Sequence, residues 1–330
     1  MNEGSIGMLS HEHNEMLCRV GRGTPMGELM RQYWVPALPS TEFPAADCPP
    51  KRMMLLGENL VMFRDSLGRM GALAEACPHR GASLYFGRNE ECGLRCAYHG
   101  WKFDIHGNCL DLPSEEGIRK ENFEANLKAR AYPCREVNHM VWVYLGARKA
   151  PPPLPLFEVL TLPPAHVTPP NMMEEANWLQ NMEGDLDSAH LDGVHRRLSE
   201  NSPKPEKGVR GFWSPEAPRP PKLDVVATEY GVYYSARRRL DNSDDWHRIN
   251  QFIFPFHTMI TSGDGKVGLR SFVPLDDTHA MLITQSADPV VPLPSGAGEA
   301  FANRFEEVGG YIERYARSAQ LLHDQIQQEE

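Results

Sequence analysis

Two short pairs of cysteine and histidine are the residues best suited to carry chemistry. One pair lies in Cys77-Pro-His79 and the other in Cys96-Ala-Tyr-His99, with sixteen residues between His79 and Cys96. A two-iron cluster with unlike ligand fields takes two thiolates on one iron and two neutral imidazoles on the other. Because each pair supplies one of each, the spacing predicts a [2Fe-2S] site. A Cys₂His₂ zinc site is the alternative, but zinc fingers group cysteine with cysteine at other spacings.

A second group of polar residues lies about ninety positions downstream. On a helix, Glu183, Asp187 and His190 fall on one face at positions i, i+4 and i+7. His195 reaches the same metal if Gly193 loosens that helix. The alternative is an acidic, solvated helix end that carries two surface histidines.

The loops CPHRGASL and CAYHGWKF resemble the cluster-binding loops of the Rieske domain in ring-hydroxylating oxygenases. The N-terminal MLSHEHNEMLCRVGRGTPMGELMRQYWVPAL and the segment FGRNEECGLRCAYHGWKFD are similar to phthalate 4,5-dioxygenase-type oxygenase components. This resemblance assigns Cys77, His79, Cys96 and His99 as cluster ligands. It implies an α+β fold with an N-terminal Rieske β domain and a C-terminal helix-grip, START-like catalytic domain of antiparallel sheet and helices.

The same resemblance gives roles to the downstream residues. A Rieske cluster moves one electron at a time and has no open position for O₂, so an oxygenase needs a second, mononuclear iron. The family motif identifies His190 and His195 as ligands of that Fe(II). Asp187 resembles the family's bridging carboxylate, which hydrogen-bonds His190 and also the cluster histidine, here His99, of a neighbouring subunit.

The third iron ligand is expected to be a carboxylate on a late helix. Asp324 precedes Glu329 by five residues, as the family pattern requires, although His323 stands where glutamine is common. Since the sequence stops at Glu330, either residues near the C-terminus are missing or Asp324 is a ligand close to the chain end. Weaker candidates are Glu313 and the pair Asp276-Asp277, which reads as a turn between strands.

A cluster of three arginines could recognise a carboxylated substrate. In a strand, alternation puts Arg237 and Arg239 on one face and Arg238 on the other. We expect one face to look into the catalytic cavity, where Arg237 and Arg239 hold a carboxylate as a fork. The alternative is a strand end that spreads its charges into solvent. Arg196 and Arg197 could instead line the cavity or cap their helix.

The chain is organised in two predicted domains. Short apolar runs such as RMMLLG (52–57) and LVMFR (60–64) predict strands, and the proline-rich KAPPPLP (149–155) predicts a linker. We therefore expect a Rieske domain with an N-terminal helical segment at 1–150 and the mononuclear-iron domain at 151–330. Long alternating stretches from residue 223 predict an antiparallel sheet, and residues from 301 onward have helical spacing.

Composition limits the class of protein. The net charge of -10 argues against a nucleic-acid partner. No apolar run approaches the roughly 18 to 20 residues of a membrane helix, and the N-terminus has no secretion signal. The seven cysteines suit a reducing compartment. We expect a cytoplasmic protein with no membrane partner.

The resemblance implies a reaction and its partners. The predicted activity is cis-dihydroxylation of an aromatic acid such as phthalate by O₂, in aromatic hydrocarbon catabolism. A separate flavin and ferredoxin-type reductase would pass NAD(P)H electrons to a homotrimer or a dimer of trimers. Two alternatives stay open: a Rieske monooxygenase that hydroxylates or O-demethylates its substrate, and a non-catalytic Rieske electron-transfer protein.

Overall fold

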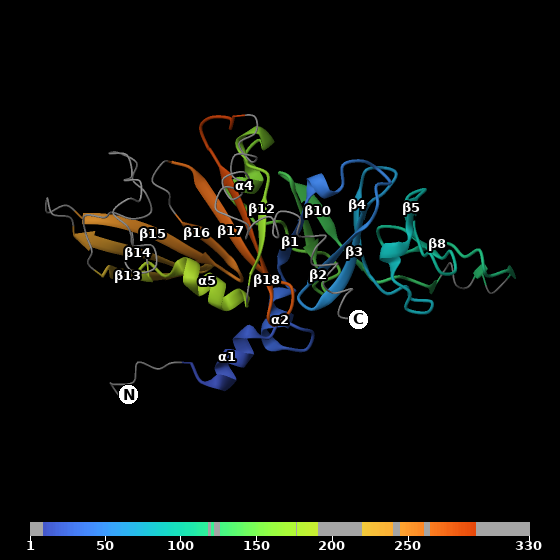
Figure 1. Ribbon diagram of the computed structural model, residues 1–330, viewed down its shortest axis with the longest axis horizontal. Helices are drawn as coiled ribbons and strands as arrows, with labels where there is room; N and C mark the ends of the chain where they lie inside the picture. The colour runs from blue at the N-terminus through green and yellow to red at the C-terminus, as the bar shows by residue number, and fades with distance from the viewer. Residues whose placement is uncertain are drawn as a thin grey trace, which may run out of the picture. The chain divides into compact units, whose positions relative to one another are not determined.

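The computed structural model describes residues 9–117, 120–121, 126–175, 177–190, 220–239, 245–260 and 265–294 (Figure 1). These residues divide into two compact units. Unit 1 holds the described residues up to Glu136, with Val141–Pro153 and Pro274–Ala280. Unit 2 holds Val137–Met140, the described residues from Leu154 to Val273, and those from Met281 onward. The main division falls within the proline-rich stretch 149–155.

One short segment from the C-terminal half belongs to unit 1. Within Pro274–Ala280, the carbonyl of Pro274 accepts a hydrogen bond from the amide of Leu56 at 2.9 Å. The carboxylate of Asp277 accepts from the amide of Val20 at 2.8 Å. The predicted second domain, 151–330, included this segment. Only contacts between residues far apart in the sequence assign it to unit 1, and the sequence does not show such contacts.

Unit 1 is built mainly of strands in three sheets, ordered β1-β11-β10, β2-β3-β4-β9 and β5-β6-β7-β8. Its elements are α1 (His11–Cys18), α2 (Pro25–Met30), β1 (Trp34–Pro39), η1 (Ser40–Glu42), β2 (Lys51–Leu55), β3 (Glu58–Arg64), β4 (Met70–Ala74), η2 (Leu84–Phe86), β5 (Arg88–Glu90), β6 (Gly93–Arg95), β7 (Lys102–Phe103), β8 (Cys109–Asp111), β9 (Ala131–Tyr132), β10 (Cys134–Val137) and β11 (Met140–Tyr144).

The hairpin of β2 and β3 shows how the sequence specifies this unit. Leu56 and Gly57 both have positive φ, at 53° and 74°, as a two-residue turn of this hand requires. The turn fixes the register that pairs Leu55 with Glu58 and Met53 with Leu60. Met53 and Leu60 are both buried on the core side. Both predicted segments, 52–57 and 60–64, therefore contain strands, except that Leu56 and Gly57 form the turn between them.

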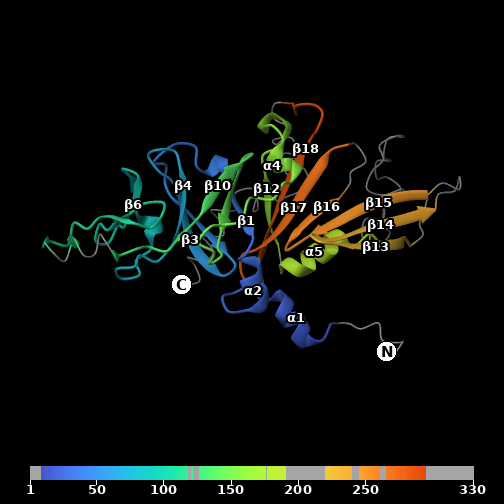
Figure 2. The same ribbon diagram turned by 180° about the vertical axis from the view of Figure 1, so that it is seen from behind.

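Unit 2 is a seven-stranded sheet in the order β12-β18-β17-β16-β15-β14-β13, and β13 to β17 pair antiparallel (Figure 2). Its elements are α4 (Glu158–Thr161), η3 (Pro164–His166), β12 (Asn171–Glu175), α5 (Trp178–Leu186), β13 (Lys222–Thr228), β14 (Gly231–Arg239), β15 (Asp245–Ile253), β16 (His257–Ile260), β17 (Val267–Pro274) and β18 (Ala280–Ala287). The predicted antiparallel sheet is confirmed, whereas the predicted helix beyond residue 301 lies outside the described residues.

Helix α5 packs against β15 and β16. Its first turn begins at Asn177, whose side-chain oxygen accepts a hydrogen bond from the amide of Leu179 at 3.0 Å. Trp178, Leu179 and Met182 are buried and form its apolar side. Of the helices described, none is long and apolar enough to cross a membrane.

His257, at the start of β16, is a buried histidine of unit 2. Its side chain is 3% exposed, its Nδ1 lies 2.8 Å from the hydroxyl oxygen of Ser271, and its ring contacts Phe157 and Phe256. Burial lowers the pKa of His257 from 6.5 to about 3. The neutral imidazole is therefore the form that fits this core.

This pKa predicts an acid-sensitive stability. Because the folded-state pKa lies below the unfolded value, His257 stabilises the fold fully above about pH 6.5 and loses that effect as the pH falls toward 3. The loss is about 1.4 kcal/mol per pH unit. We expect His257→Gln to flatten the decline of Tm between roughly pH 6.5 and 4. The exposed His247 gives the control, and a His257→Gln decline as steep as that of His247→Gln would contradict the assignment.

Candidate metal centres

The two cysteine and histidine loops of unit 1 close in the same way. In each loop the amide of a glycine four residues on donates to the carbonyl of the cysteine: Gly81 to Cys77 at 2.9 Å, and Gly100 to Cys96 at 3.1 Å. Both glycines have positive φ, at 73° and 76°, which other residues rarely adopt. The sequence thus builds two matching turns, each with its cysteine at the start.

The two loops bring like ligands together. The thiol of Cys77 is in hydrogen-bonding contact with that of Cys96, and the ring centroids of His79 and His99 are 4.5 Å apart. Trp101 stacks on His79 with centroids 4.1 Å apart and an angle of 6°. Two sulfurs therefore lie on one side of the site and two imidazoles on the other, as an unsymmetrical two-iron cluster requires.

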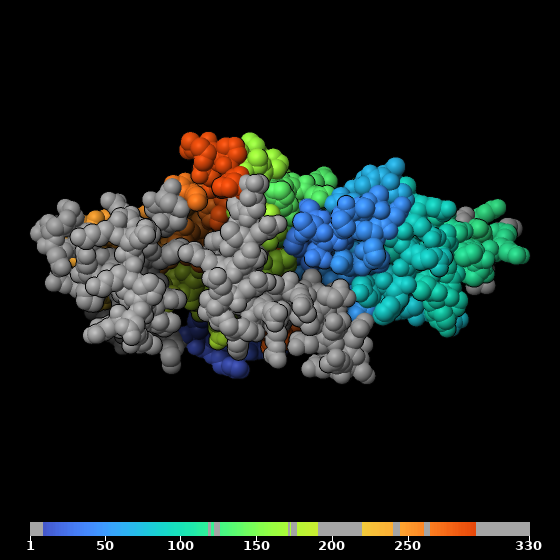
Figure 3. All heavy atoms as spheres, turned by 45° about the horizontal axis from the view of Figure 1, so that its top comes forward, coloured from blue at the N-terminus to red at the C-terminus, as the bar shows by residue number. Residues whose placement is uncertain are grey.

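The sulfurs are buried and the imidazoles face outward. Cys77 and Cys96 are each 3% exposed within an apolar core, and both histidines are half-buried. Strands β5 to β8, teal in Figure 3, form part of the surface of unit 1. Tyr98, next to His99, is 64% exposed. The imidazole side of the site can thus be reached from outside the unit.

Burial raises the pKa of the Cys77 thiol to about 11, and the thiol of Cys96 adds to that rise. The backbone amides of His79 and Arg80 hydrogen-bond the Cys77 sulfur and lower its pKa. A bound iron deprotonates a coordinating thiol, and amides directed at the sulfur tune the potential of a cluster. The two thiols, the two imidazoles and the amides around them therefore fit a [2Fe-2S] cluster.

No three or more His, Cys, Asp or Glu side chains gather around a single ion position within the described residues. A [2Fe-2S] cluster does not need such a group, because each of its irons takes only two protein ligands. A zinc ion, which needs three or four, fits this arrangement less well.

In unit 2 the observed helix differs from the predicted one. Helix α5 ends at Leu186, and Asp187 follows it in an extended conformation with φ -67° and ψ 116°. The prediction that Glu183, Asp187 and His190 share one helical face is therefore wrong. The reason is local, because the Asp187 side chain binds amides beyond the helix and so favours a turn.

That turn nevertheless brings Asp187 and His190 together. The carboxylate of Asp187 accepts hydrogen bonds from the amide of Ala189 at 2.7 Å and from the amide of His190 at 3.2 Å. Its Oδ2 lies 3.5 Å from Nδ1 of His190. The other candidate residues for the mononuclear-iron site and its surroundings lie outside the described part of the chain: His195, Arg196, Arg197, Glu313 and Asp324.

The structure places the three arginines of β14 on two different surfaces. Arg237 and Arg239 both bind the carboxylate of Asp245 at 3.0 Å, and their side chains are 31% and 54% exposed. Arg238 is 4% exposed, and its Nη2 donates to the carbonyl of Ser188 at 2.7 Å. The sequence analysis missed a second buried arginine, Arg248. In the register of β14 and β15, Arg248 pairs with Ala236 and so lies on the same face as Arg238.

The weaker candidates Asp276 and Asp277 form the turn that the sequence predicted. Asp276 accepts hydrogen bonds from the amides of Thr278 and His279, both at 2.7 Å. Asp277 binds Arg19 at 3.0 Å. These contacts hold a loop, which accounts for both carboxylates.

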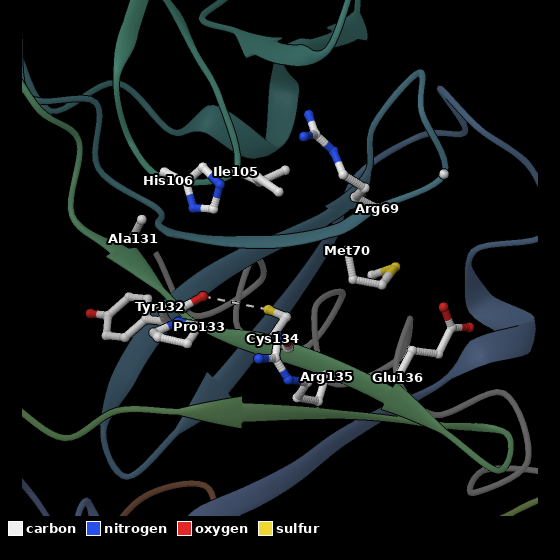
Figure 4. Close-up of a pocket in the computed structure, with 11 residues that line it drawn as sticks. Arg69, Met70, Ile105, His106, Ala131, Tyr132, Pro133, Cys134, Arg135 and Glu136 are labelled. Atoms are coloured by element: carbon white, nitrogen blue, oxygen red, sulfur yellow. Dashed lines mark hydrogen bonds between the residues drawn. The ribbon is translucent and has the colours of Figure 1, made fainter. Parts of the chain in front are cut away.

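Unit 1 also has a cavity of about 610 Å³ (Figure 4). It is lined by Gly68, Arg69, Met70, Ile105, His106, Ala131, Tyr132, Pro133, Cys134, Arg135 and Glu136, so none of the four predicted cluster ligands borders it. The Cys134 thiol donates to the carbonyl of Tyr132 at 3.5 Å. Burial raises the pKa of Cys134 to about 12, so the thiol is protonated at neutral pH.

Comparison with known proteins agrees with this arrangement. Residues 33–125 match the Rieske [2Fe-2S] domain, and residues 143–286 match the LigXa C-terminal domain like family. The first match contains both cysteine and histidine loops. The second contains Asp187, His190 and the sheet of unit 2 up to β18.

Individual relatives are oxygenase subunits. The chain is 43% identical to the 3-chlorobenzoate-3,4-dioxygenase oxygenase subunit of Comamonas testosteroni, over 82% of this chain and 61% of the relative. It is 37% identical to the phthalate 4,5-dioxygenase oxygenase subunit of Pseudomonas putida, over 82% and 63%. The chain thus spans about three fifths of the length of these relatives.

A solved structure shares the fold. Dicamba monooxygenase bound to 3,6-dichlorosalicylic acid superposes with a TM-score of 0.64 at 18% identity, over 83% of this chain and 82% of that one. The chain therefore combines a Rieske [2Fe-2S] domain with a LigXa-type C-terminal domain, and it is similar to the oxygenase subunits of Rieske oxygenases.

Proposed function

We propose that this chain is the oxygenase component of an aromatic-ring dioxygenase that cis-dihydroxylates an aromatic acid. The observation that carries the proposal is the presence of two separate ligand groups in one chain. Unit 1 pairs two thiols and two imidazoles, and unit 2 sets Asp187 against His190. An electron carrier needs only the first group, whereas an oxygenase needs both.

In this proposal, Cys77 and Cys96 hold one iron of the cluster, and His79 and His99 hold the other. His190, His195 and Asp324 are the proposed ligands of the mononuclear iron. When bound, these groups supply one-electron transfer and O₂ activation.

Asp187 acts as a positioning residue in this scheme. Its carboxylate already lies beside the His190 ring and would orient that imidazole toward the iron. A second hydrogen bond, to His99 of the partner subunit in a homotrimer, would join the two centres across subunits. The electrons would come from NAD(P)H through a separate flavin and ferredoxin-type reductase.

The proposed substrate is an aromatic carboxylate, because the relatives named above act on 3-chlorobenzoate and phthalate. From the sequence we predicted that Arg237 and Arg239 bind the carboxylate of the substrate. Both now share the carboxylate of Asp245, so a substrate would have to compete with that ion pair. A monooxygenase remains the second candidate, since the fold also matches dicamba monooxygenase.

Product analysis separates these reactions. The purified chain would be loaded with iron, supplied with a compatible reductase and labelled O₂, and given 3-chlorobenzoate and phthalate. A dihydrodiol that carries two labelled oxygens supports the dioxygenase, and a phenol or demethylated product with one supports the monooxygenase. Absence of any turnover, with about two irons per chain instead of about three, would leave only the electron carrier.

The proposed iron ligand near the chain end gives a further prediction. We expect Asp324→Ala to lose the mononuclear iron while the Rieske absorption is retained, because one carboxylate of a three-residue site is removed. Iron analysis together with the visible spectrum checks both parts. Asp276→Ala is the control, since that carboxylate holds a turn. Full iron content and turnover in Asp324→Ala would show that the ligand lies elsewhere.

A further inference from the structure

The loop that carries Cys96 and His99 is the connection between β6 and β7. Arg95, the last residue of β6, pairs with Lys102, the first residue of β7. Within this pair the amide of Cys96 donates to the carbonyl of Trp101 at 2.8 Å. Backbone hydrogen bonds therefore hold the base of the loop, and its tip carries the ligand His99.

The side chain of Arg95 ties this loop to two other strands. Its Nη1 donates to the carbonyl of Gly100 at 2.7 Å and to the carboxylate of Asp111, on β8, at 2.8 Å. Its Nε donates to the carboxylate of Glu90, on β5, at 2.6 Å. The side chain is only 13% exposed. Because a planar guanidinium group held by two carboxylates keeps its N–H groups in fixed directions, the Gly100 carbonyl has a rigid donor.

Gly100 lies between the two residues that govern the imidazoles of the cluster site. The residue before it is the ligand His99, and the residue after it, Trp101, stacks on His79 with ring centroids 4.1 Å apart. The carbonyl that the guanidinium group binds belongs to the planar peptide group that joins Gly100 to Trp101. A rotation of this peptide group would therefore move the two imidazoles relative to each other.

The first cluster loop is stiffened in another way. Pro78 lies between its two ligands and fixes a backbone angle there, whereas the exposed Ala97 and Tyr98 separate the ligands of the second loop. In the first loop the hydroxyl of Ser83, which follows the closing turn, donates to the carboxylate of Glu75. In the second loop the guanidinium group reaches the closing turn itself, and it restrains a segment that has no proline between its ligands.

We propose that Arg95 is a positioning residue of the [2Fe-2S] cluster. By holding the Gly100 carbonyl, its guanidinium group fixes the backbone that carries His99. It orients His79 through the stacked ring of Trp101. Groups that orient a metal-bound histidine tune the metal, and the hydrogen bonds and charges around an iron–sulfur cluster set its potential. Arg95 thus controls how readily the cluster takes up and passes on an electron, whichever substrate the chain oxidises.

The test measures the cluster of the full, iron-loaded chain in the absence of substrate. Arg95→Lys keeps the positive charge, but its single nitrogen cannot bind Glu90, Asp111 and the Gly100 carbonyl with the geometry of the planar fork. We expect this variant to show changed g values in its electron paramagnetic spectrum and a shifted midpoint potential. Arg95→Gln also removes the cation that the two carboxylates share. We expect its potential to be lower than that of the wild type, because added negative charge disfavours reduction.

Two controls separate charge from position. Arg88→Gln is the matched single variant, because Arg88 pairs with Arg95 across the two strands and binds the same Glu90 at 3.1 Å, while its side chain is 66% exposed. It removes the same charge but keeps the donor to Gly100, so we expect nearly wild-type g values. The double variant Arg95→Gln/Glu90→Gln restores the net charge without the hydrogen bond, and we expect its g values to stay changed.

Wild-type g values and potential in Arg95→Lys would show that any cation suffices at this position, and would overturn the proposal. A return to wild-type values in the double variant would also overturn it, because charge alone would then account for the effect. If Arg95→Gln does not fold, the Arg95→Lys spectrum decides the question. Reduced iron and sulfide content in Arg95→Lys supports the proposal when the Tm of its cluster-free form equals that of the cluster-free wild type.

The proposed function fails in a different way. A wild-type chain whose Rieske spectrum depends on Arg95 but which forms no oxygenated product supports this inference and contradicts the oxygenase. A chain that forms product while the Arg95 variants keep the wild-type spectrum and potential contradicts this inference alone. A wild-type chain that binds no [2Fe-2S] cluster overturns both.

Discussion

Cys96→Ser is expected to abolish the Rieske absorption and the low-g electron paramagnetic signal of the chain. Cys96 is buried beside Cys77, in an apolar core where only a thiolate pair is available for one iron. A serine hydroxyl has a far higher pKa than a thiol and is a hard ligand, so it does not replace cysteine at this centre. The measurement is the visible and paramagnetic spectrum of the purified variant, with iron and sulfide analysis.

Cys92→Ser is the matched control. Cys92 is only four residues away and half-buried, and its backbone amide, which the substitution keeps, donates to Ser66 at 2.8 Å. We expect the cluster of that variant to form normally. A Cys96→Ser chain with an unchanged Rieske spectrum would mean that the ligand assignment in this loop is incorrect, whatever the other loop does.

The cluster loops could be predicted from sequence because their determinants are local. Gly81 and Gly100 each stand four residues after a cysteine, and both adopt the positive φ that closes the turn. The two histidines then meet at 4.5 Å because two equivalent turns face each other. No distant contact had to be known in order to pair these residues.

The end of α5 could not be predicted in the same way. Helical spacing favoured one continuous face through His190, but a single aspartate side chain bound two amides and stopped the helix at Leu186. Such competition between side chain and backbone is decided by a few tenths to about 1 kcal/mol. Periodicity does not measure differences of that size.

The arginines show the limit set by long-range packing. Alternation correctly separated Arg238 from Arg237 and Arg239. Arg238 binds Ser188 on one surface of the sheet, and the other two arginines bind Asp245 on the opposite surface. It could not say which surface faces inward. That depends on α5, which lies about fifty residues earlier in the sequence and covers the side of the sheet that carries Arg238.

Asp187→Asn is expected to keep both metals and to lower turnover by roughly 10- to 100-fold, as is typical when a group that orients a metal-bound histidine is changed. The carboxylate lies 3.5 Å from Nδ1 of His190, where it is placed to accept a hydrogen bond from that ring and to favour the tautomer whose other nitrogen would be available for iron. An amide of the same shape keeps the turn but is a weaker acceptor. The measurements are iron content, kcat, and the rate at which substrate and O₂ reoxidise the reduced cluster.

Glu183→Gln makes the same change of charge four residues earlier. Its side chain is exposed near the end of α5, and only its backbone carbonyl bonds Asp187, at 2.9 Å. We expect its reoxidation rate to match that of the wild type, so that slow reoxidation in Asp187→Asn reports on the carboxylate itself and not on net charge. If the cluster of Asp187→Asn is reoxidised at the wild-type rate, electrons do not depend on this carboxylate, and Asp187 only shapes the turn that follows α5.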